Sequence, residues 1–320
     1  MYSPSQLIKQ YEEIIIISHV RPDGDAIGSL AALQLGLEQL GKKVIPVLKD
    51  SPPEIFSFLP HGKTPIQNEF PKGDNRLVII VDLNDLIRTG FLETIQKFSE
   101  NNPLIVIDHH PKGDLFRIAK AIIHKESASS AAEIVYSLLI DLGVKITPSI
   151  ATSLLTGIYT DTGGFQYPNT TTQTLELGAE LMRRGARLDT ITRQIFHTKT
   201  VAGLKLLGLA LERLHLTHDE QCAVSFITHE DIRACNASPE DIGGIIGELN
   251  VLPQVKFSLF LTEIKSGTIQ GSLRTGEGHR VKVNQLAKLC EGGGHPRAAG
   301  FTIPGHIDHN KVTGKWSIVP

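Results

Sequence analysis

The feature that most constrains the fold is a set of short apolar runs in the first third of the chain. These runs are rich in β-branched residues, and they are Ile14–Ile17, Val44–Leu48, Leu77–Val81 and Leu104–Ile107. A strand that is apolar at nearly every position is buried on both faces, which is typical of parallel strands in an α/β sheet. The runs therefore predict four strands that are covered by helices on both sides.

Helical patterns alternate with these runs. Apolar residues recur at helical spacing over residues 5–13, 26–40, 91–98, 130–142 and 148–159. Strands that alternate with helices imply right-handed crossovers and a parallel sheet. In such a sheet, ligands bind beyond the carboxyl ends of the strands. Polar residues that directly follow the apolar runs are therefore the first candidates for a functional site.

The pattern changes after the middle of the chain. A helix is expected over 175–185, and 188–214 is helical almost throughout, with a weak point at His197-Thr198. Beyond it, strands are expected over 223–227, 255–262 and 268–273, and helices over 239–249 and 284–289. The sequence predicts an α/β domain with a parallel sheet and helices on both faces at 1–190, a helical linker at 191–204, and a smaller α/β domain at 205–320.

The overall composition excludes some classes of protein. The net charge of -2 and the pI of about 6.7 give no support to a protein that coats duplex nucleic acid, because such proteins usually carry a basic face. The three cysteines are widely spaced, which fits a reducing compartment. No signal peptide precedes residue 20, and no apolar run approaches the ~18 residues of a membrane span. We expect a cytoplasmic protein without membrane association.

Four clusters of acidic residues and histidines lie at or after apolar runs. They are His19-Val20-Arg21-Pro22-Asp23-Gly24-Asp25, Val81-Asp82, Asp108-His109-His110 and Asp161-Thr162-Gly163. The first three follow predicted strands. A lone carboxylate at a buried strand end, such as that of Asp82, is costly unless it is paired or bound to a metal. The clusters together predict a metal site, with Asp82 as the natural bridge between two ions.

Each cluster also has an ordinary explanation. An Asp-x-Asp pair usually lies in a solvated loop, and a His-His pair is often exposed on the surface without a functional role. Asp161 could cap a helix. Adjacent side chains diverge, so one histidine of the His109-His110 pair is expected to bind metal and the other to face the substrate. Because the clusters occur together, metal binding is favoured. Several carboxylates with few histidines and no cysteine favour manganese or magnesium over zinc.

Small residues accompany the metal clusters. Gly28 and Ser29 open the helix after the first cluster, where a second backbone or a phosphate could approach closely. Near the far end of the chain, Gly292, Gly293 and Gly294 precede His295. Their amides suit a nest that binds phosphate, and Arg274 offers a guanidinium for the same purpose. The metal clusters and this segment together indicate hydrolysis of a phosphate ester.

The combined motifs resemble those of the DHH/DHHA1 phosphoesterases, which include the RecJ exonucleases, and most closely the oligoribonuclease (nanoRNase) subgroup. The resemblance covers nearly the whole chain. The matching stretches are Ser18–Ser29, Val81-Asp82 with Asp85 and Arg88, Asp108–Pro111, Thr156–Gly163, Gly271–Arg274 and Gly292–Phe301. One residue departs from the pattern, since Glu291 stands where many relatives carry a glycine.

The resemblance implies a role for each residue. The metal ligands would be His19, Asp23 and Asp82 for one ion, and Asp25, Asp82, His109 and Asp161 for the other. Asp108 would orient its neighbours, His110 would face the scissile phosphate, and Arg88 would assist it. The nucleotide would be bound by Arg274, Gly292, Gly293, Gly294 and His295. The cofactors would be two divalent ions, Mn²⁺ or alternatively Mg²⁺.

The expected function is a manganese-dependent phosphoesterase that hydrolyses short oligonucleotides (nanoRNA) to mononucleotides with a water activated by two metals. The resemblance also implies hydrolysis of adenosine 3′,5′-bisphosphate to AMP. Three alternatives stay open: a phosphodiesterase of linear or cyclic dinucleotides such as pApA or c-di-AMP, an inorganic pyrophosphatase, and a non-catalytic module that binds single-stranded nucleic acid. The expected partners are short RNA or DNA oligonucleotides or nucleotides. The physiological substrate, the direction of attack and a homodimer are left open.

Overall fold

A five-stranded parallel sheet is the frame of the first half of the chain. Its strands are β1 (Glu13–Ile17), β2 (Lys43–Val47), β3 (Leu77–Val81), β4 (Leu104–Asp108) and β5 (Ala121–His124). They lie in the order β2-β1-β3-β4-β5, and every neighbouring pair is parallel. The four predicted strands are confirmed. The short strand β5 was not predicted.

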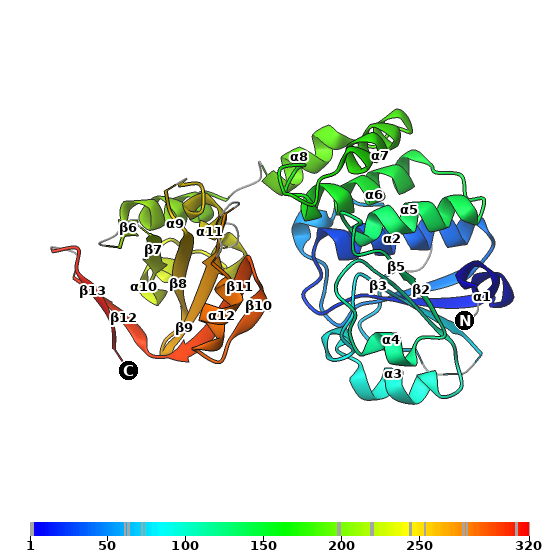
Figure 1. Cartoon of the computed structure of the whole chain (residues 1–320), viewed down its shortest axis with the longest axis horizontal. Coiled ribbons are helices and arrows are strands. Elements are labelled where there is room, and N and C mark those ends of the chain that lie inside the picture. Colours follow the sequence, from blue (N-terminus) through cyan, green and yellow to red (C-terminus); the bar gives the residue numbers. More distant parts are fainter. Residues whose placement is uncertain are drawn as a thin grey trace. The chain divides into compact units, whose positions relative to one another are not determined.

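Helices cover both faces of this sheet, as Figure 1 shows. On one side lie α2 (Gly24–Gln39), α5 (Ala131–Asp141) and α6 (Pro148–Asp161), and on the other lie α3 (Leu92–Ser99) and α4 (Leu115–Ile118). Successive residues of β1 enter different cores. Ile14 and Ile16 pack with the first group of helices, and Ile15 and Ile17 pack with the second. This is the reason why an unbroken isoleucine run forms a buried strand here.

The remaining elements of the first half surround this core. The helix α1 (Pro4–Gln10) ends earlier than predicted, because Glu13 already belongs to β1. The helices α7 (Thr172–Arg183) and α8 (Leu188–Phe196) pack against α6. Short 3-10 turns are η1 (Glu54–Phe56) and η2 (Ile87–Thr89).

The direction in which successive strands are added to the sheet changes between β1 and β3. From β1 the chain passes to β2 on one side, whereas β3 lies on the other side of β1. The connections that leave β1 and β3 therefore diverge, and they open a crevice at the carboxyl ends of these two strands. Ser18, directly after β1, donates a hydrogen bond from its hydroxyl to the carbonyl of Val81 at 2.8 Å. The two strand ends beside the crevice are thus tied together.

Two glycines let α2 and α6 approach closely. A Cβ atom at Gly28 would lie 2.5 Å from the carbonyl oxygen of Ser153 and 2.9 Å from the backbone nitrogen of Gly157. A Cβ atom at Gly157 would lie 2.6 Å from Oδ1 of Asp25. The close approach expected at Gly28 is therefore that of the α6 backbone. It brings the C-terminal end of α6 next to the first turn of α2.

A mixed sheet is the frame of the second half. Its strands are β6 (His215–Leu216), β7 (Cys222–Ile227), β8 (Phe257–Lys265), β9 (Thr268–Arg274), β10 (Gly293–His295) and β11 (Ala298–Pro304), in the order β10-β11-β9-β8-β7-β6. The helices are α9 (Val201–Glu212), α10 (His229–Ala234), α11 (Ile245–Leu249) and α12 (Val283–Lys288). The strands β12 (His306–His309) and β13 (Trp316–Val319) form a separate pair. An α/β fold in both halves confirms the predicted fold class.

The structure is a computed structural model that describes residues 3–319 except 61, 63, 64, 72, 74, 197–199, 218–220, 243, 244, 253, 277, 278, 280, 311 and 312. It divides into two compact units, Met1–Thr198 and Lys199–Pro320. The linker expected at 191–204 contains the end of α8 and the start of α9, and the weak point at 197–198 lies outside the described residues. The helix expected over 239–249 consists of η3 (Pro239–Ile242) and α11, separated by undescribed residues.

In the part of the chain that the structure describes, every helix falls short of the length and apolarity that crossing a bilayer requires.

The different space around two helical glycines predicts opposite effects when each is replaced by alanine. We expect Gly28→Ala to lower the free energy of unfolding by about 1–3 kcal/mol, because the added methyl group meets the α6 backbone. Gly208→Ala is the matched control, since Gly208 is also helical but has open space at its Cβ position. This variant should be more stable than the wild type by roughly 0.5–1 kcal/mol. Urea unfolding measures both, and equal effects would contradict the packing account.

Candidate metal centre

The ends of three strands and two helices bring the predicted metal ligands together. His19 lies two residues after β1, Asp82 directly follows β3, and His109 directly follows β4. Asp25 lies in the first turn of α2, and Asp161 is the last residue of α6. These five and the sixth predicted ligand, Asp23 at the N-cap of α2, belong to the first unit and meet at the ends of β1 and β3. The rule that polar residues after strands meet at one edge of the sheet does not apply to Asp161, because no strand precedes this residue.

A first group of donors consists of His19, Asp23 and Asp82, whose ligand atoms lie within 4.8 Å of one another. Nε2 of His19 is 3.7 Å from Oδ1 of Asp23 and 3.6 Å from Oδ2 of Asp82. The carbonyl of Val20 accepts a hydrogen bond from Nδ1 of His19 at 2.9 Å. This bond selects the tautomer in which Nε2 carries a lone pair toward the two carboxylates.

A second group of donors consists of Asp25, His109 and Asp161. Nε2 of His109 lies 4.0 Å from Oδ2 of Asp25, 3.5 Å from Oδ2 of Asp161 and 3.5 Å from Oδ1 of Asp82. The carbonyl of Ala128 lies 3.4 Å from Nδ1 of His109 and can accept its proton. His109 thus also directs Nε2 toward carboxylates. Asp82, His109 and His110 form a further group of donors within 4.8 Å of one another, so the division of roles between the two histidines stays a prediction.

The carboxylate of Asp82 joins the two groups. Its Oδ2 faces His19 and its Oδ1 faces His109. Asp82 has φ +59°, a backbone conformation that is uncommon for a residue other than glycine, and strain of this kind is often retained at functional sites. Its N–H donates to the carbonyl of Ile107 at 2.9 Å, which fixes the turn. The predicted bridging position of Asp82 agrees with this geometry.

Two buried atoms support the presence of cations at this site. Among the described residues, Nε2 of His109 and Oδ1 of Asp82 are buried without a hydrogen-bond partner. An unpaired buried polar atom costs free energy, and metal coordination removes that cost. The ion pairs of Asp23, Asp25, Asp82 and Asp161 within the described chain involve histidines only. No lysine or arginine there balances their charge, so the donor set fits divalent cations.

Backbone amides hold Asp25 in position. Its Oδ2 accepts from the N–H of Ala131 at 2.6 Å, and its Oδ1 accepts from the N–H of Ala132 at 3.0 Å. Both amides belong to the first turn of α5, where the helix dipole stabilises a negative charge. The hydroxyl of Ser29 also donates to Oδ1 at 3.1 Å. These contacts were not predicted, because amides of a distant helix leave no pattern in the sequence.

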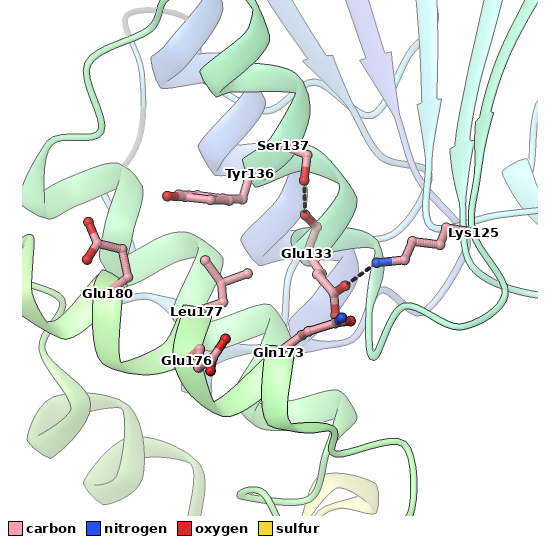
Figure 2. A pocket seen from close by; sticks show the side chains of 8 residues that line it. All are labelled: Lys125, Glu133, Tyr136, Ser137, Gln173, Glu176, Leu177 and Glu180. Carbon is pink, nitrogen blue, oxygen red and sulfur yellow. Dashed lines mark hydrogen bonds and ion pairs between the residues drawn. The ribbon is translucent and has the colours of Figure 1, made fainter.

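A salt bridge also supports the N-terminal end of α5. Glu133 accepts from Nζ of Lys125 at 2.9 Å and from the N–H of Ser129 at 3.0 Å. Figure 2 shows the Lys125–Glu133 pair at the wall of a pocket between α5 and α7. The pocket is lined by Lys125, Glu133, Tyr136, Ser137, Gln173, Glu176, Leu177 and Glu180. None of these residues is a metal ligand, so we assign to Glu133 a supporting role at the start of α5.

The electrostatics of the side chains favour extra protons in the cluster. Burial opposes the charged form of His19 and His109, but the neighbouring carboxylates outweigh burial and raise the pKa of each imidazole to about 10. Burial, followed by the charges of Asp82 and Asp161, raises the pKa of Asp25 well above its usual range. Burial likewise raises the pKa of Asp161 to about 6. The site has a deficit of positive charge that protons or cations can fill.

Asp108 positions the two histidines that follow it. Its buried Oδ1 accepts from the N–H groups of His109 and His110, at 2.9 and 3.2 Å, and from Nδ1 of His110 at 2.9 Å. The carbonyl of His110 accepts from Nε2 of His124 at 2.7 Å. The side chain of His110 is 26% exposed, and its Nδ1 also lies 3.6 Å from Oδ1 of Asp82. His124, on the unpredicted strand β5, is a contributor that the sequence did not reveal.

Arg88 lies apart from these contacts. It belongs to η2, and its carbonyl accepts a hydrogen bond from the N–H of Val20 at 2.7 Å. Its side chain is exposed, and it forms no ion pair among the described residues. The backbone of Arg88 therefore supports the His19 turn, while its expected catalytic contact stays a prediction.

The predicted nucleotide-binding residues lie in the second unit. Gly293–His295 forms the edge strand β10 instead of a loop. The strand register aligns Arg274 of β9 with Ala298 of β11, and Ala298 with His295 of β10. The side chain of His295 lies outside the described part of the structure, and Gly292 directly precedes the strand. Glu291 is exposed and has φ +55°, which is the conformation that favours glycine at this position.

Comparison with known proteins gives matches along nearly the whole chain. The model of the DHH family, N-terminal domain, matches residues 13–158, and the model of the DHHA1 domain matches residues 219–313. Two similar proteins are both named bifunctional oligoribonuclease and PAP phosphatase NrnA. The one from Thermus thermophilus is 32% identical over 94% of this chain and 87% of its own length. The one from Bacillus subtilis is 29% identical over 92% of this chain and 91% of its own length.

A solved structure agrees with these matches. The crystal structure of an exopolyphosphatase-related protein from Bacteroides fragilis superposes with a TM-score of 0.83 at 27% identity, and the match covers 93% of this chain and 88% of that one. The identity with the Thermus protein extends through both units. The resemblance inferred from the motifs is thereby confirmed, and the chain belongs to the DHH family of phosphoesterases, with a DHHA1 domain in its second unit.

Proposed function

We propose that this protein is a manganese-dependent phosphoesterase that hydrolyses short oligoribonucleotides to mononucleotides and adenosine 3′,5′-bisphosphate to AMP. The observation that carries the proposal is the pair of donor groups joined by Asp82, in which Nε2 of His109 and Oδ1 of Asp82 are buried 3.5 Å apart without a hydrogen-bond partner. The names of the Thermus and Bacillus relatives support the two substrates. Manganese is favoured by a donor set of several carboxylates with few imidazoles.

The ligands of the proposed cations are the six residues predicted for this role. His19, Asp23 and Asp82 would bind one ion, and Asp25, His109 and Asp161, together with Asp82, would bind the other. Two divalent cations there would supply Lewis acidity, which neutralises phosphate charge and lowers the pKa of a water molecule. Because the ligands lie on strand and helix ends, their positions are set before any substrate arrives.

His110 is proposed to donate a proton to the leaving group. Its Nδ1 proton is donated to Asp108, and this bond sets both the tautomer and the orientation of the ring. In this role the ring would donate a proton from Nε2 to the leaving oxygen. In this account Asp108 is a positioning residue and His110 is the acid. Arg88 is proposed to stabilise charge on the phosphate.

The second unit is proposed to bind the nucleotide part of the substrate. Arg274 and His295 are aligned in the register of one sheet, on strands β9 and β10 that flank β11, and guanidinium groups bind phosphate in bidentate geometry. Of the three glycines before His295, Gly293 has open space at its Cβ position, whereas Gly292 and Gly294 lie against β11. A dedicated nucleotide-binding unit favours nucleotides over inorganic pyrophosphate as substrates.

A panel of substrates tests the proposed function. With Mn²⁺, the purified protein should consume an RNA dinucleotide and adenosine 3′,5′-bisphosphate rapidly and a long single-stranded RNA slowly. Chromatography of the products should show mononucleotides from the first and AMP from the second. Inorganic pyrophosphate and cyclic dinucleotides complete the panel. Exclusive hydrolysis of either would replace the proposal with a pyrophosphatase or a cyclic-dinucleotide phosphodiesterase.

The bridging position of Asp82 predicts that Asp82→Ala abolishes turnover, because the substitution removes a donor from both groups. The same substitution should remove the rise in melting temperature that Mn²⁺ gives to the wild-type protein. Asp141→Ala is the matched control, since Asp141 is an exposed carboxylate at the end of α5. Activity assays and thermal unfolding at several Mn²⁺ concentrations measure both effects. Near-normal turnover of Asp82→Ala would exclude the scheme with two metals.

The separation of roles between the two histidines can also be measured. We expect His110→Ala to reduce kcat roughly 100- to 10,000-fold, which is the usual contribution of general acid catalysis. Its affinity for Mn²⁺, measured by isothermal titration calorimetry, should stay close to that of the wild type. His109→Ala should instead weaken Mn²⁺ binding. If His110→Ala loses Mn²⁺ affinity as strongly as His109→Ala, then His110 is a ligand and not the acid.

A further inference from the structure

An aromatic ring is exposed in the turn that follows the proposed metal ligand Asp161. Tyr167 lies in the turn between α6 and α7, six residues after Asp161. Its side chain is 57% exposed, whereas the neighbouring Phe165 is partly buried against the core. Single exposed aromatic residues are ordinary on protein surfaces. Tyr167 differs from such residues because hydrogen bonds fix its turn and because its ring lies against the backbone.

The turn that carries Tyr167 is fixed by several hydrogen bonds. The N–H groups of Gln166 and Tyr167 both donate to the carbonyl of Thr162 at 2.9 Å. The side-chain amide of Asn169 donates to the carbonyl of Asp161 at 3.1 Å and to that of Ser129 at 2.9 Å. The turn is therefore attached directly to the backbone of a proposed metal ligand.

Two further residues set the direction of the turn. Phe165 has φ +65°, and its ring packs edge-on against Tyr159 with a centroid distance of 5.4 Å. Backbone strain of this kind persists only where the surroundings enforce it. Because Phe165 is turned inward, the exposed tip of the turn consists of Gln166, Tyr167 and Pro168.

The ring of Tyr167 lies against Gly163. A Cβ atom at Gly163 would be 2.5 Å from the ring carbons of Tyr167, so the glycine provides the space in which the ring lies. Gly163 has φ +58° and follows Asp161 by two residues, so their Cα atoms are no more than about 7 Å apart. The ring is thus supported by backbone, remains largely open to solvent, and lies within the reach of one nucleotide from Asp161.

We propose that Tyr167 stacks against the base of the nucleotide whose phosphate is bound at the metal centre. The inference rests on the proposed function, and it adds a residue that contacts the base to a site that otherwise contacts phosphate. Stacking tolerates all bases, because each base has a π-face. A rigidly held ring also loses little conformational entropy on binding, which suits a short substrate with few contacts. A tyrosine in this position therefore favours nucleotide esters over inorganic ones.

The test compares substrates with and without bases. We expect Tyr167→Ala to raise the KM for an RNA dinucleotide about 5- to 150-fold, which corresponds to the loss of one stacked base. The kcat should change little, because the metal ligands are intact. For the same dinucleotide with both bases removed, the wild type and Tyr167→Ala should have equal KM values. Tyr167→Phe should retain the wild-type KM for the normal dinucleotide, since it keeps the ring.

Met182→Ala is the control, because Met182 is 48% exposed near the end of α7 and should leave both KM values unchanged. An unchanged KM of Tyr167→Ala for the normal dinucleotide overturns the inference. Equal losses on the normal and the base-free dinucleotide also overturn it, since they would indicate a structural role. If the wild type hydrolyses no nucleotide at all, the proposed function fails first, and the inference fails with it.

Discussion

The mutual repulsion of carboxylates in one buried crevice is the constraint on which the rest of the first unit depends. Asp25 and Asp82 are almost fully buried, and Asp161 is largely covered. Within the described chain, their compensation comes from backbone amides and imidazoles and not from lysine or arginine. Such an arrangement is costly for the protein alone, and it becomes favourable when cations are bound. The protein without cations is therefore less stable, but its oxygen and nitrogen donors are already in place for binding.

The topology explains how the donors can be held against this repulsion. The ends of β1, β3 and β4 fix His19, Asp82 and His109 on a sheet whose strands are buried on both faces. The contact of Gly28 with the α6 backbone brings Asp161 into the same crevice. Because packed interiors deform little, the carboxylates cannot move apart to relieve their repulsion. The packing of α2 against α6 is thus as important for the proposed metal centre as the candidate ligands are.

The sequence predicted the frame and the candidate ligands that the structure brings together, because both leave local patterns. Apolar runs gave β1 to β4, and the acidic clusters after them gave the candidate ligands. Other features depend on contacts between distant segments. The amides of Ala131 and Ala132 that hold Asp25 have no sequence signature. The strand β5 was missed because it is short and partly exposed, and β10 was missed because Gly293–His295 lacks strand-forming residues and is paired only through β11.

The contribution of α6 has a consequence for the order in which the protein is made. Synthesis proceeds from the N-terminus, so His19, Asp25, Asp82 and His109 leave the ribosome well before Asp161, which ends α6. The same helix supplies Gly157, against which the first turn of α2 packs. A chain that ends before this helix contains the amides of α5 that bind Asp25, but it lacks the last carboxylate and the α6 backbone against which α2 packs. The donor set is therefore complete only once about half of the chain has been made.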